Sequence, residues 1–265
     1  MGFETTPTAF AAAMRTGEPA TYLVEGKHLT EPQCRALFAA LPLLDRHIKV
    51  LDRIEGDTLV DVGCFSGAFV REASRRFPGK TITGVDYFED NIRIARLLYP
   101  EIRDCYQQMS VYQLEFADAT VDCVTLQETL EHLEGAALAI KEINRVLKTG
   151  GALIVSVPNP FYIRRVAAFA ASEIGNALRR LLGRPSRLAT EVLSASIEWD
   201  RHVYAWTPQT LLTLLASNGF AYVEHCYESN VPDRLRRWLL TMLPFIGPTQ
   251  ILKVRKVAPA PAKLV

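Results

Sequence analysis

The alternation of apolar and polar positions divides the middle of this chain into strands and helices that follow one another in turn. Short apolar runs that predict buried strands lie at residues 58–62, 81–85, 122–126 and 152–157. Between them, apolar residues recur at helical spacing over residues 68–76, 90–98 and 135–147. The last helix is expected to end at Thr149-Gly150-Gly151. Strands that alternate with helices predict a mostly parallel sheet covered on both faces.

The chain extends this pattern toward both ends. A helix at residues 208–218 precedes two more strands, at 220–227 and 250–257, so the sheet has about seven strands. Apolar positions around residues 34–44 predict that the segment 1–47 is an N-terminal helical cap and not a second domain. We therefore expect one α/β domain over residues 48–258, followed by a flexible tail at 259–265.

The composition agrees with one globular domain, and the balance of charges excludes a strong overall electrostatic field. The 265 residues are 49% hydrophobic and 22% charged, which allows a substantial core. Lys plus Arg (30) nearly balance Asp plus Glu (29), so net charge gives no argument for nucleic acid or an acidic partner.

Cysteine spacing and the N-terminus predict a cytoplasmic protein. The five cysteines are odd in number and never form a CxxC pair, which favours reduced thiols over a disulfide framework. The N-terminus lacks a basic region followed by an apolar one, and no apolar run approaches the ~18 residues of a membrane span.

A glycine-containing turn follows the first strand of the pattern. Gly63 and Gly67 let the backbone approach a ligand that side chains would exclude. Asp86 ends the next strand, where a carboxylate can accept hydrogen bonds from both hydroxyls of a ribose. The alternative is a tight turn followed by an acid that caps a helix. The two features at this spacing favour a ribose-containing ligand.

Residues 48–227 resemble the class I S-adenosylmethionine (SAM)-dependent methyltransferases. The motif Asp61-x-Gly63-x-x-x-Gly67 matches the first motif of that family, and Asp86 matches its ribose-binding acid. Further matches lie at residues 114–124, 145–151, 156–159 and 218–220. The resemblance implies a Rossmann-like, doubly wound, mostly parallel seven-stranded sheet with its last strand antiparallel, and helical insertions over the active site.

The resemblance also implies the cofactor site. Phe65 stands where the family usually has a central glycine, and Ser110 stands where many members have an aspartate near the adenine. The residues that it implies for binding SAM are Asp61, Gly63, Cys64, Gly67, Asp86, Tyr87, Ser110 and Gln127.

Polar residues follow the strand at 122–126, at the sheet edge where open α/β folds bind ligands. Glu128, Glu131 and His132 can converge if the chain turns into a helix there, because positions three or four apart share a face. Mixed oxygen and nitrogen ligands suit magnesium, manganese, iron or zinc. A later polar cluster at residues 198–208 could close over the same place, with His202 as a fourth ligand or a base.

Both clusters resemble those of metal-assisted members of the family. Ubiquinone-pathway O-methyltransferases carry a similar Glu-x-x-Glu-His, and small-RNA 2′-O-methyltransferases carry it together with a later aromatic-Trp-Thr segment. This implies that Glu128, Glu131, His132 and His202 hold a divalent metal that lowers the pKa of an acceptor hydroxyl. Without a metal, Glu131, His132 and His202 would act on the substrate directly, with His132 as general base. A structural role, such as capping the next helix, is the third alternative.

Two insertions, at residues 158–206 and 229–249, leave from carboxyl ends of strands and are expected to overhang the substrate site. The first has apolar residues at helical spacing, namely Ile163, Val166, Ala170, Ile174, Ala177 and Leu181. Its arginines are Arg164, Arg165, Arg179, Arg180, Arg184 and Arg187, and the second insertion also sets arginines beside apolar residues. The alternatives are a lid packed on the core, contact with an anionic membrane, and a cradle for a phosphate-bearing substrate.

These features predict a SAM-dependent methyltransferase that acts on a hydroxyl of a small-molecule, lipid- or quinone-like, or saccharide acceptor. An RNA 2′-O-methyltransferase is disfavoured, because net charge is near zero and no RNA-binding module is appended. A degenerate SAM-binding protein is a further alternative. A nicotinamide-dependent oxidoreductase would require Gly-x-Gly-x-x-Gly, which residues 63–67 do not supply. The acceptor's identity and the oligomeric state stay open.

Overall fold

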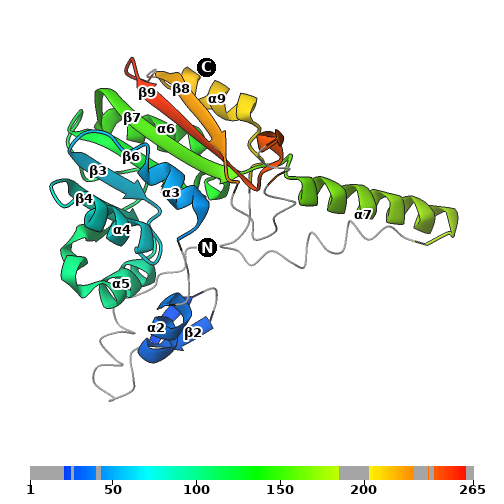
Figure 1. Cartoon of the computed structure of the whole chain (residues 1–265), viewed down its shortest axis with the longest axis horizontal. Helices are drawn as coiled ribbons and strands as arrows, with labels where there is room; N and C mark the ends of the chain where they lie inside the picture. The colour runs from blue at the N-terminus through cyan, green and yellow to red at the C-terminus, as the bar shows by residue number, and fades with distance from the viewer. Residues whose placement is uncertain are drawn as a thin grey trace.

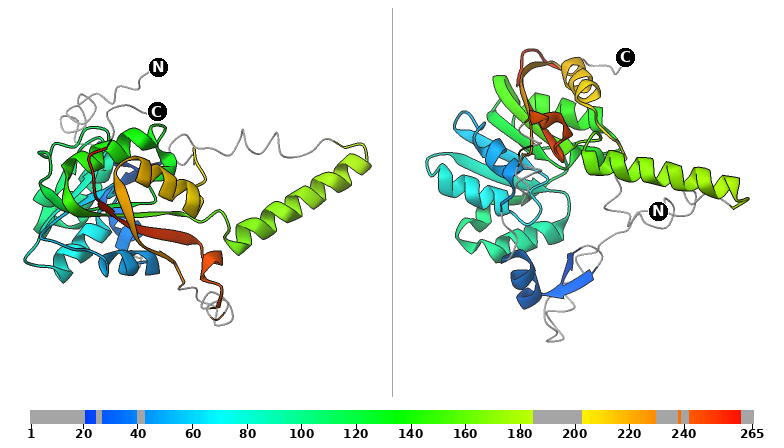
Figure 2. Two further views of the ribbon diagram at one scale, coloured as in Figure 1. Left: turned by 90° about the horizontal axis from the view of Figure 1, so that it is seen from above. Right: turned by 45° about the vertical axis from the view of Figure 1, so that its right-hand side comes forward.

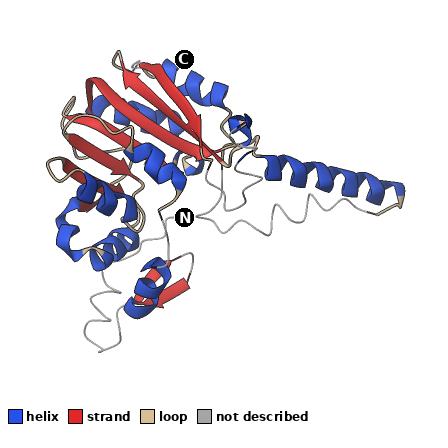
Figure 3. Ribbon diagram, viewed as in Figure 1, coloured by secondary structure: helices blue, strands red, loops and turns tan. Residues whose placement is uncertain are grey.

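A twisted sheet with helices on both faces forms the body of the protein (Figures 1 and 3). The structure is a computed structural model, and it describes residues 21–24, 27–39, 43–184, 203–229, 238 and 242–260. The sheet has seven strands in the order β5-β4-β3-β6-β7-β9-β8. Their bounds are β3 Thr58–Val62, β4 Thr81–Asp86, β5 Tyr106–Gln108, β6 Val121–Gln127, β7 Leu147–Pro158, β8 Phe220–Tyr227 and β9 Thr249–Lys256.

The strand directions confirm the expected sheet. Strands β5, β4, β3, β6 and β7 pair in parallel, and β9 runs antiparallel to both β7 and β8. Their side chains are buried on both faces, as in other parallel sheets covered by helices. The mostly parallel, seven-stranded prediction with an antiparallel last strand is therefore confirmed.

Two groups of helices cover the two faces. Helices α6 (Ala136–Val146) and α9 (Pro208–Ser217) contribute buried residues to one core, including Ile140, Ile143, Leu211 and Leu215. Helices α3 (Asp45–Leu51), α4 (Ala68–Arg76) and α5 (Glu89–Leu98) contribute to the other, with Leu51, Phe69, Val70 and Ile92. The two cores bury the apolar side of these helices, of which the sequence pattern predicts α4, α5, α6 and α9.

Two local predictions differ from the structure. Helix α6 ends at Val146, and strand β7 begins at once, so Gly150 and Gly151 lie inside a strand and do not cap a helix. The cause is pairing with β6, which shifts register between Val121 and Cys123 and leaves Gly150 at a φ of 83°. Strand β5 is missing from the sequence prediction, because three residues are too few for a periodic pattern to emerge.

The N-terminal segment contains more than the expected helices. Strands β1 (Thr21–Val24) and β2 (Lys27–Thr30) pair antiparallel ahead of helix α2 (Glu31–Ala39), and the sequence pattern does not predict this hairpin. The expected boundary between residues 47 and 48 falls inside α3. Residues 1–20 and 261–265 lie outside the described part of the chain.

The first insertion forms a long helix, α7 (Ile163–Leu181), that projects away from the sheet (Figures 1 and 2). Its predicted apolar face is exposed, with Ile163, Ile174 and Leu181 at 51%, 64% and 83%. The alternative of a lid that packs this face on the core is therefore wrong for the described residues. In the second insertion the short helix η3 (Pro244–Ile246) is described. Among the helices that the structure describes, none has the length and apolar character needed to cross a membrane.

Candidate active site

The turn between β3 and α4 is shaped by two glycines that tolerate no side chain. Gly63 and Gly67 have φ values of 79° and 78°, which favour glycine. A Cβ on Gly63 would stand 2.3 Å from Thr129 Oγ1, and one on Gly67 would stand 2.6 Å from the Tyr106 ring. The backbone N–H of Gly63 donates to Val85 O at 2.8 Å, so the turn is fastened to the neighbouring strand β4.

Asp86 ends β4 beside this turn, as predicted. Its Oδ2 accepts from the backbone N–H of Phe65 at 2.9 Å, and its Oδ1 accepts from Phe88 N and Asn91 Nδ2, both at 3.0 Å. The carboxyl group is buried, which raises its pKa although these donors oppose the shift. Three donors, one in the glycine turn, one just before α5 and one in α5, therefore fix an acid at the carboxyl edge of the sheet.

Asp61 connects β3 to β6 beneath the turn. Its Oδ1 accepts from Thr125 Oγ1 at 2.6 Å and from Gln127 Nε2 at 3.2 Å. Burial raises the pKa of Asp61 to about 7, against the hydrogen bonds from Thr125 and Gln127. Gln127 Oε1 is buried and has no hydrogen-bond partner among the described residues.

The remaining residues proposed for the cofactor lie at the same edge. Cys64 is buried, and burial raises the pKa of its thiol. Tyr87 follows β4 and is 67% exposed, whereas Ser110 follows β5 and accepts at its Oγ from Tyr112 N at 3.2 Å. The structure thus brings to one sheet edge Asp61, Gly63, Cys64, Gly67, Asp86, Tyr87, Ser110 and Gln127.

An acidic pair follows β6. Glu128 takes a φ of 48°, and its N–H donates to Ser156 O at 2.9 Å, which directs the chain into the short helix η2 (Leu130–His132). Glu131 is 1% exposed, and neither carboxyl oxygen has a hydrogen-bond partner among the described residues. Burial and the nearby Glu128 raise the pKa of Glu131 to about 8, and burial raises that of Glu128 to about 7.

The described donors do not form a metal site. Of the proposed ligands, His132 and Glu131 lie near each other, with His132 Nε2 3.9 Å from Glu131 Oε1. Within the described ranges, no three His, Cys, Asp or Glu side chains gather as a metal ion requires. His202, the fourth proposed ligand, lies outside those ranges. The described residues therefore do not support the predicted divalent ion.

Two arginines act electrostatically on the acidic pair, and the sequence prediction places only Arg165, in an insertion that overhangs the substrate site, near it. Arg46 of α3 and Arg165 of α7 both lower the pKa of Glu128 and of Glu131, against the effect of burial. Arg46 precedes the strand–helix pattern, and Arg165 enters the sequence prediction only as part of the basic face of an insertion. No local signal in the sequence shows that these two charges act on Glu128 and Glu131 in particular.

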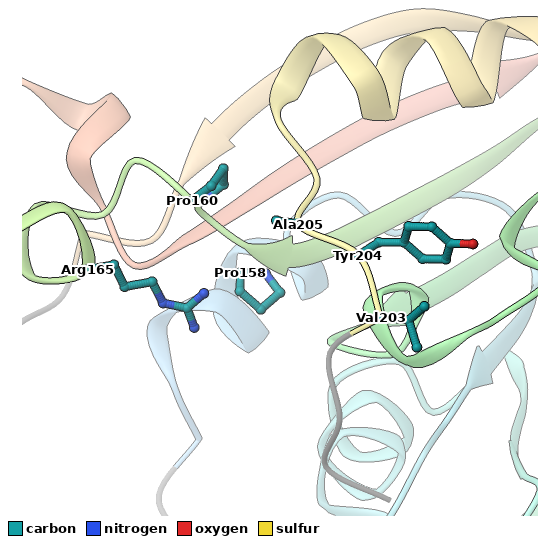
Figure 4. Close-up of a pocket in the computed structure, with 6 residues that line it drawn as sticks. All are labelled: Pro158, Pro160, Arg165, Val203, Tyr204 and Ala205. Atoms are coloured by element: carbon teal, nitrogen blue, oxygen red, sulfur yellow. The ribbon is translucent and has the colours of Figure 1, made fainter. Parts of the chain in front are cut away.

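A cavity of about 360 Å³ lies between the end of β7, the start of α7 and residues 203–205 (Figure 4). It is lined by Pro158, Pro160, Arg165, Val203, Tyr204 and Ala205. The backbone N–H groups of Val203 and Tyr204 donate to Glu131 O at 2.8 and 3.2 Å, so this wall crosses directly over η2. A cavity of this volume at the carboxyl edge of the strands is the size and place expected for a small ligand.

Comparison with known proteins agrees with this geometry. A family model described as "Methyltransferase domain" matches residues 60–155. The chain is 35% identical over 195 residues to the ubiquinone biosynthesis O-methyltransferase of Alkalilimnicola ehrlichii, covering 72% of this chain and 74% of the relative. It is 30% identical over 186 residues to the protein of the same name from Paracidovorax citrulli, covering 63% of this chain and 74% of that one.

Solved structures show the same fold at low identity. The chain matches a SAM-dependent methyltransferase from Mesorhizobium loti with a TM-score of 0.53 and 18% identity, covering 78% of this chain and 96% of that one. It matches geranyl diphosphate C-methyltransferase from Streptomyces coelicolor A3(2) with a TM-score of 0.55 and 19% identity, covering 85% and 82%.

The raised pKa of Asp61 predicts a pH-dependent stability. The unfolded chain releases this proton near pH 3.8, whereas the folded protein retains it to about pH 7. The folded state binds more protons between these values, so this group's contribution to stability falls as pH rises through that window. In Asp61→Asn, the free energy of unfolding relative to wild type should rise by up to about 1.4 kcal/mol per pH unit across it.

Urea unfolding at intervals from pH 4.5 to 7.5 measures this difference. Asp122→Asn is the control, because Lys148 lowers the pKa of Asp122 and its contribution is lost only as pH falls toward the acid range. Parallel stability curves for wild type and Asp61→Asn over the whole window would contradict the buried, protonated Asp61.

Proposed function

Because this chain belongs to the class I SAM-dependent methyltransferases, we propose that it transfers the methyl group of SAM to a hydroxyl of a quinone-like, lipid-like small molecule. Support for the acceptor class comes from the relatives named as ubiquinone biosynthesis O-methyltransferases. The observation that carries the proposal is the juxtaposition of Asp86 beside the glycine turn with the Glu131–His132 pair at the same sheet edge.

In the proposed reaction, the chain binds and orients both partners. When bound, SAM supplies a methyl group already activated by its sulfonium. Asp86, held by the N–H of Phe65, would accept hydrogen bonds from the ribose, and the turn at residues 63–67 would let the backbone approach the cofactor. The acceptor occupies the cavity that Tyr204 and Arg165 help to line. Binding there orients the acceptor hydroxyl toward the methyl group.

The methyl-transfer reaction also requires a group that accepts the proton of the acceptor hydroxyl. The acceptor oxygen attacks in line, the O–CH₃ bond forms, the S–CH₃ bond breaks, and S-adenosylhomocysteine (SAH) is released. His132 accepts the hydroxyl proton as general base, and Oε1 of the buried Glu131 lies 3.9 Å from its Nε2. These steps account for every bond and for the proton of the reaction without a metal ion.

We also propose that α7 rests on an anionic membrane surface. Its exposed apolar residues include Ile163, Phe169 and Ile174, and its described arginines include Arg179 and Arg180 in the last turn. An apolar face flanked by arginines is the composition that binds an interface of anionic lipid. A lipid-tailed acceptor would be held in such a membrane.

The second insertion extends the same surface. Asn159 Nδ2 donates to Phe245 O and to Gly247 O, both at 2.7 Å, so η3 is fastened at the base of α7. Phe161 and Phe245 are 52% and 50% exposed on the two sides of this contact. Both insertions therefore expose an apolar side chain next to the contact made by Asn159.

Cofactor binding is the first test. Wild type is expected to bind SAH, measured by isothermal titration calorimetry, and Asp86→Ala is expected to weaken binding at least about a hundredfold, because a buried ribose acceptor is lost. Glu89→Ala, an exposed acid three residues along, should bind like wild type. Absence of binding by wild type would favour a degenerate member of the family.

Methyl transfer to catechol and quinol acceptors tests the proposed base. His132→Ala should lower kcat by about 10²- to 10⁴-fold, the usual contribution of a general base, with unchanged SAH affinity. Turnover is expected without added metal. Activity abolished by a chelator and restored by one divalent ion would instead support the metal-assisted mechanism.

Vesicle co-sedimentation tests the membrane contact. The protein should sediment with vesicles that contain phosphatidylglycerol and stay in solution with phosphatidylcholine alone. Phe169→Asp with Ile174→Asp should abolish sedimentation, whereas Leu138→Asp, an exposed leucine on α6, should not. Wild type left wholly in the supernatant with anionic vesicles would refute the membrane contact.

A further inference from the structure

Phe65 holds a backbone conformation that aromatic residues rarely adopt. Its φ is 48°, at the position of the turn where the family motif usually has glycine. Non-glycine residues in this region are strained and persist where the surrounding structure holds them. Phe65 N also donates to Asp86 Oδ2, so this strained residue is in direct contact with the acid proposed to bind the ribose.

A second aromatic ring holds Phe65 from a distant part of the chain. The ring of Phe38, on α2, meets the ring of Phe65 edge to face, with centroids 5.6 Å apart and planes at 71°. Phe38 is buried, whereas Phe65 is 41% exposed, so one side of the Phe65 ring is covered and the rest is open. Edge-to-face geometry is the favourable arrangement of two aromatic rings.

Helix α2 is itself fixed to the element that follows Asp86. Tyr22, Val24, Cys34 and Phe38 form a buried cluster with Ile94 of α5. Leu23 N donates to Asp90 Oδ2 at 3.2 Å, and the Arg93 guanidinium lies 4.9 Å from the centroid of the Tyr22 ring. The unit formed by β1, β2 and α2 therefore contacts both α5, which follows Asp86 in the chain, and the glycine turn, which precedes it.

We propose that Phe38 and Phe65 are cofactor-positioning residues. Phe38 holds the Phe65 ring, and through it the strained turn, in the conformation that presents the Phe65 N–H to Asp86 and keeps the carboxylate aimed at the ribose. The N-terminal unit thus forms part of the cofactor site without donating a polar group to it. This inference rests on the proposed function only in taking SAM as the cofactor.

A double-mutant cycle read out by SAH affinity tests the pair. Phe38→Ala should weaken SAH binding about tenfold in the wild-type chain, the size expected for losing one aromatic pair. In the Phe65→Gly background, where ring and strain are both gone, the same change should alter affinity less than about twofold. Phe38→Leu keeps an apolar side chain in the cluster, so this variant should retain the fold and still show the weaker SAH binding.

Val24→Ala is the matched control, because Val24 belongs to the same buried cluster and is not the residue that meets the Phe65 ring. It should lower the melting temperature and leave SAH affinity within about twofold of wild type. Equal loss of affinity in Phe38→Ala and Val24→Ala, or equal effects of Phe38→Ala in both backgrounds, would overturn the inference. Wild type that binds no SAH would overturn the proposed function instead, and this inference with it.

Discussion

Parallel pairing of β3 with its two neighbours is the constraint on which the rest of the structure depends. In this register Asp61 lies opposite both Gly84 of β4 and Thr125 of β6. Parallel strands end at the same edge, so the residues that follow β3, β4 and β6 meet there whatever their distance in sequence. The glycine turn, Asp86 and the acidic segment from Glu128 to His132 are neighbours for this reason.

That edge also concentrates carboxyl groups in a setting that opposes their ionisation. Burial raises the pKa of Asp61 to about 7, of Glu128 to about 7 and of Glu131 to about 8. Of these three acids, Glu131 has no hydrogen-bond partner on either carboxyl oxygen among the described residues, and Glu128 has none on Oε1, which a fold optimised for stability alone would avoid. Polar groups held unsatisfied beside a cavity are typical of sites that await a ligand.

In the first insertion, the sequence pattern predicts a helix but not what its apolar face contacts. The helical spacing of apolar residues in α7 predicts the helix correctly, yet it does not decide between a packed lid and an exposed face. An apolar stripe has the same period whether its partner is the core or something outside the chain. The structure leaves most of this face exposed, and the first insertion meets the sheet only at its base and through residues 203–206, as far as its described residues extend.

The sequence by itself determined the βα alternation, the position of α4, the glycine turn, and Asp86 at the end of β4, because each depends on local periodicity or on backbone conformations that only certain residues allow. Contacts in the folded chain establish that β7 starts at Leu147, that the charges of Arg46 and Arg165 act on Glu128 and Glu131, and that Phe38 meets Phe65. These features arise from contacts between residues far apart in the chain, and no local pattern encodes which distant partner a side chain will find.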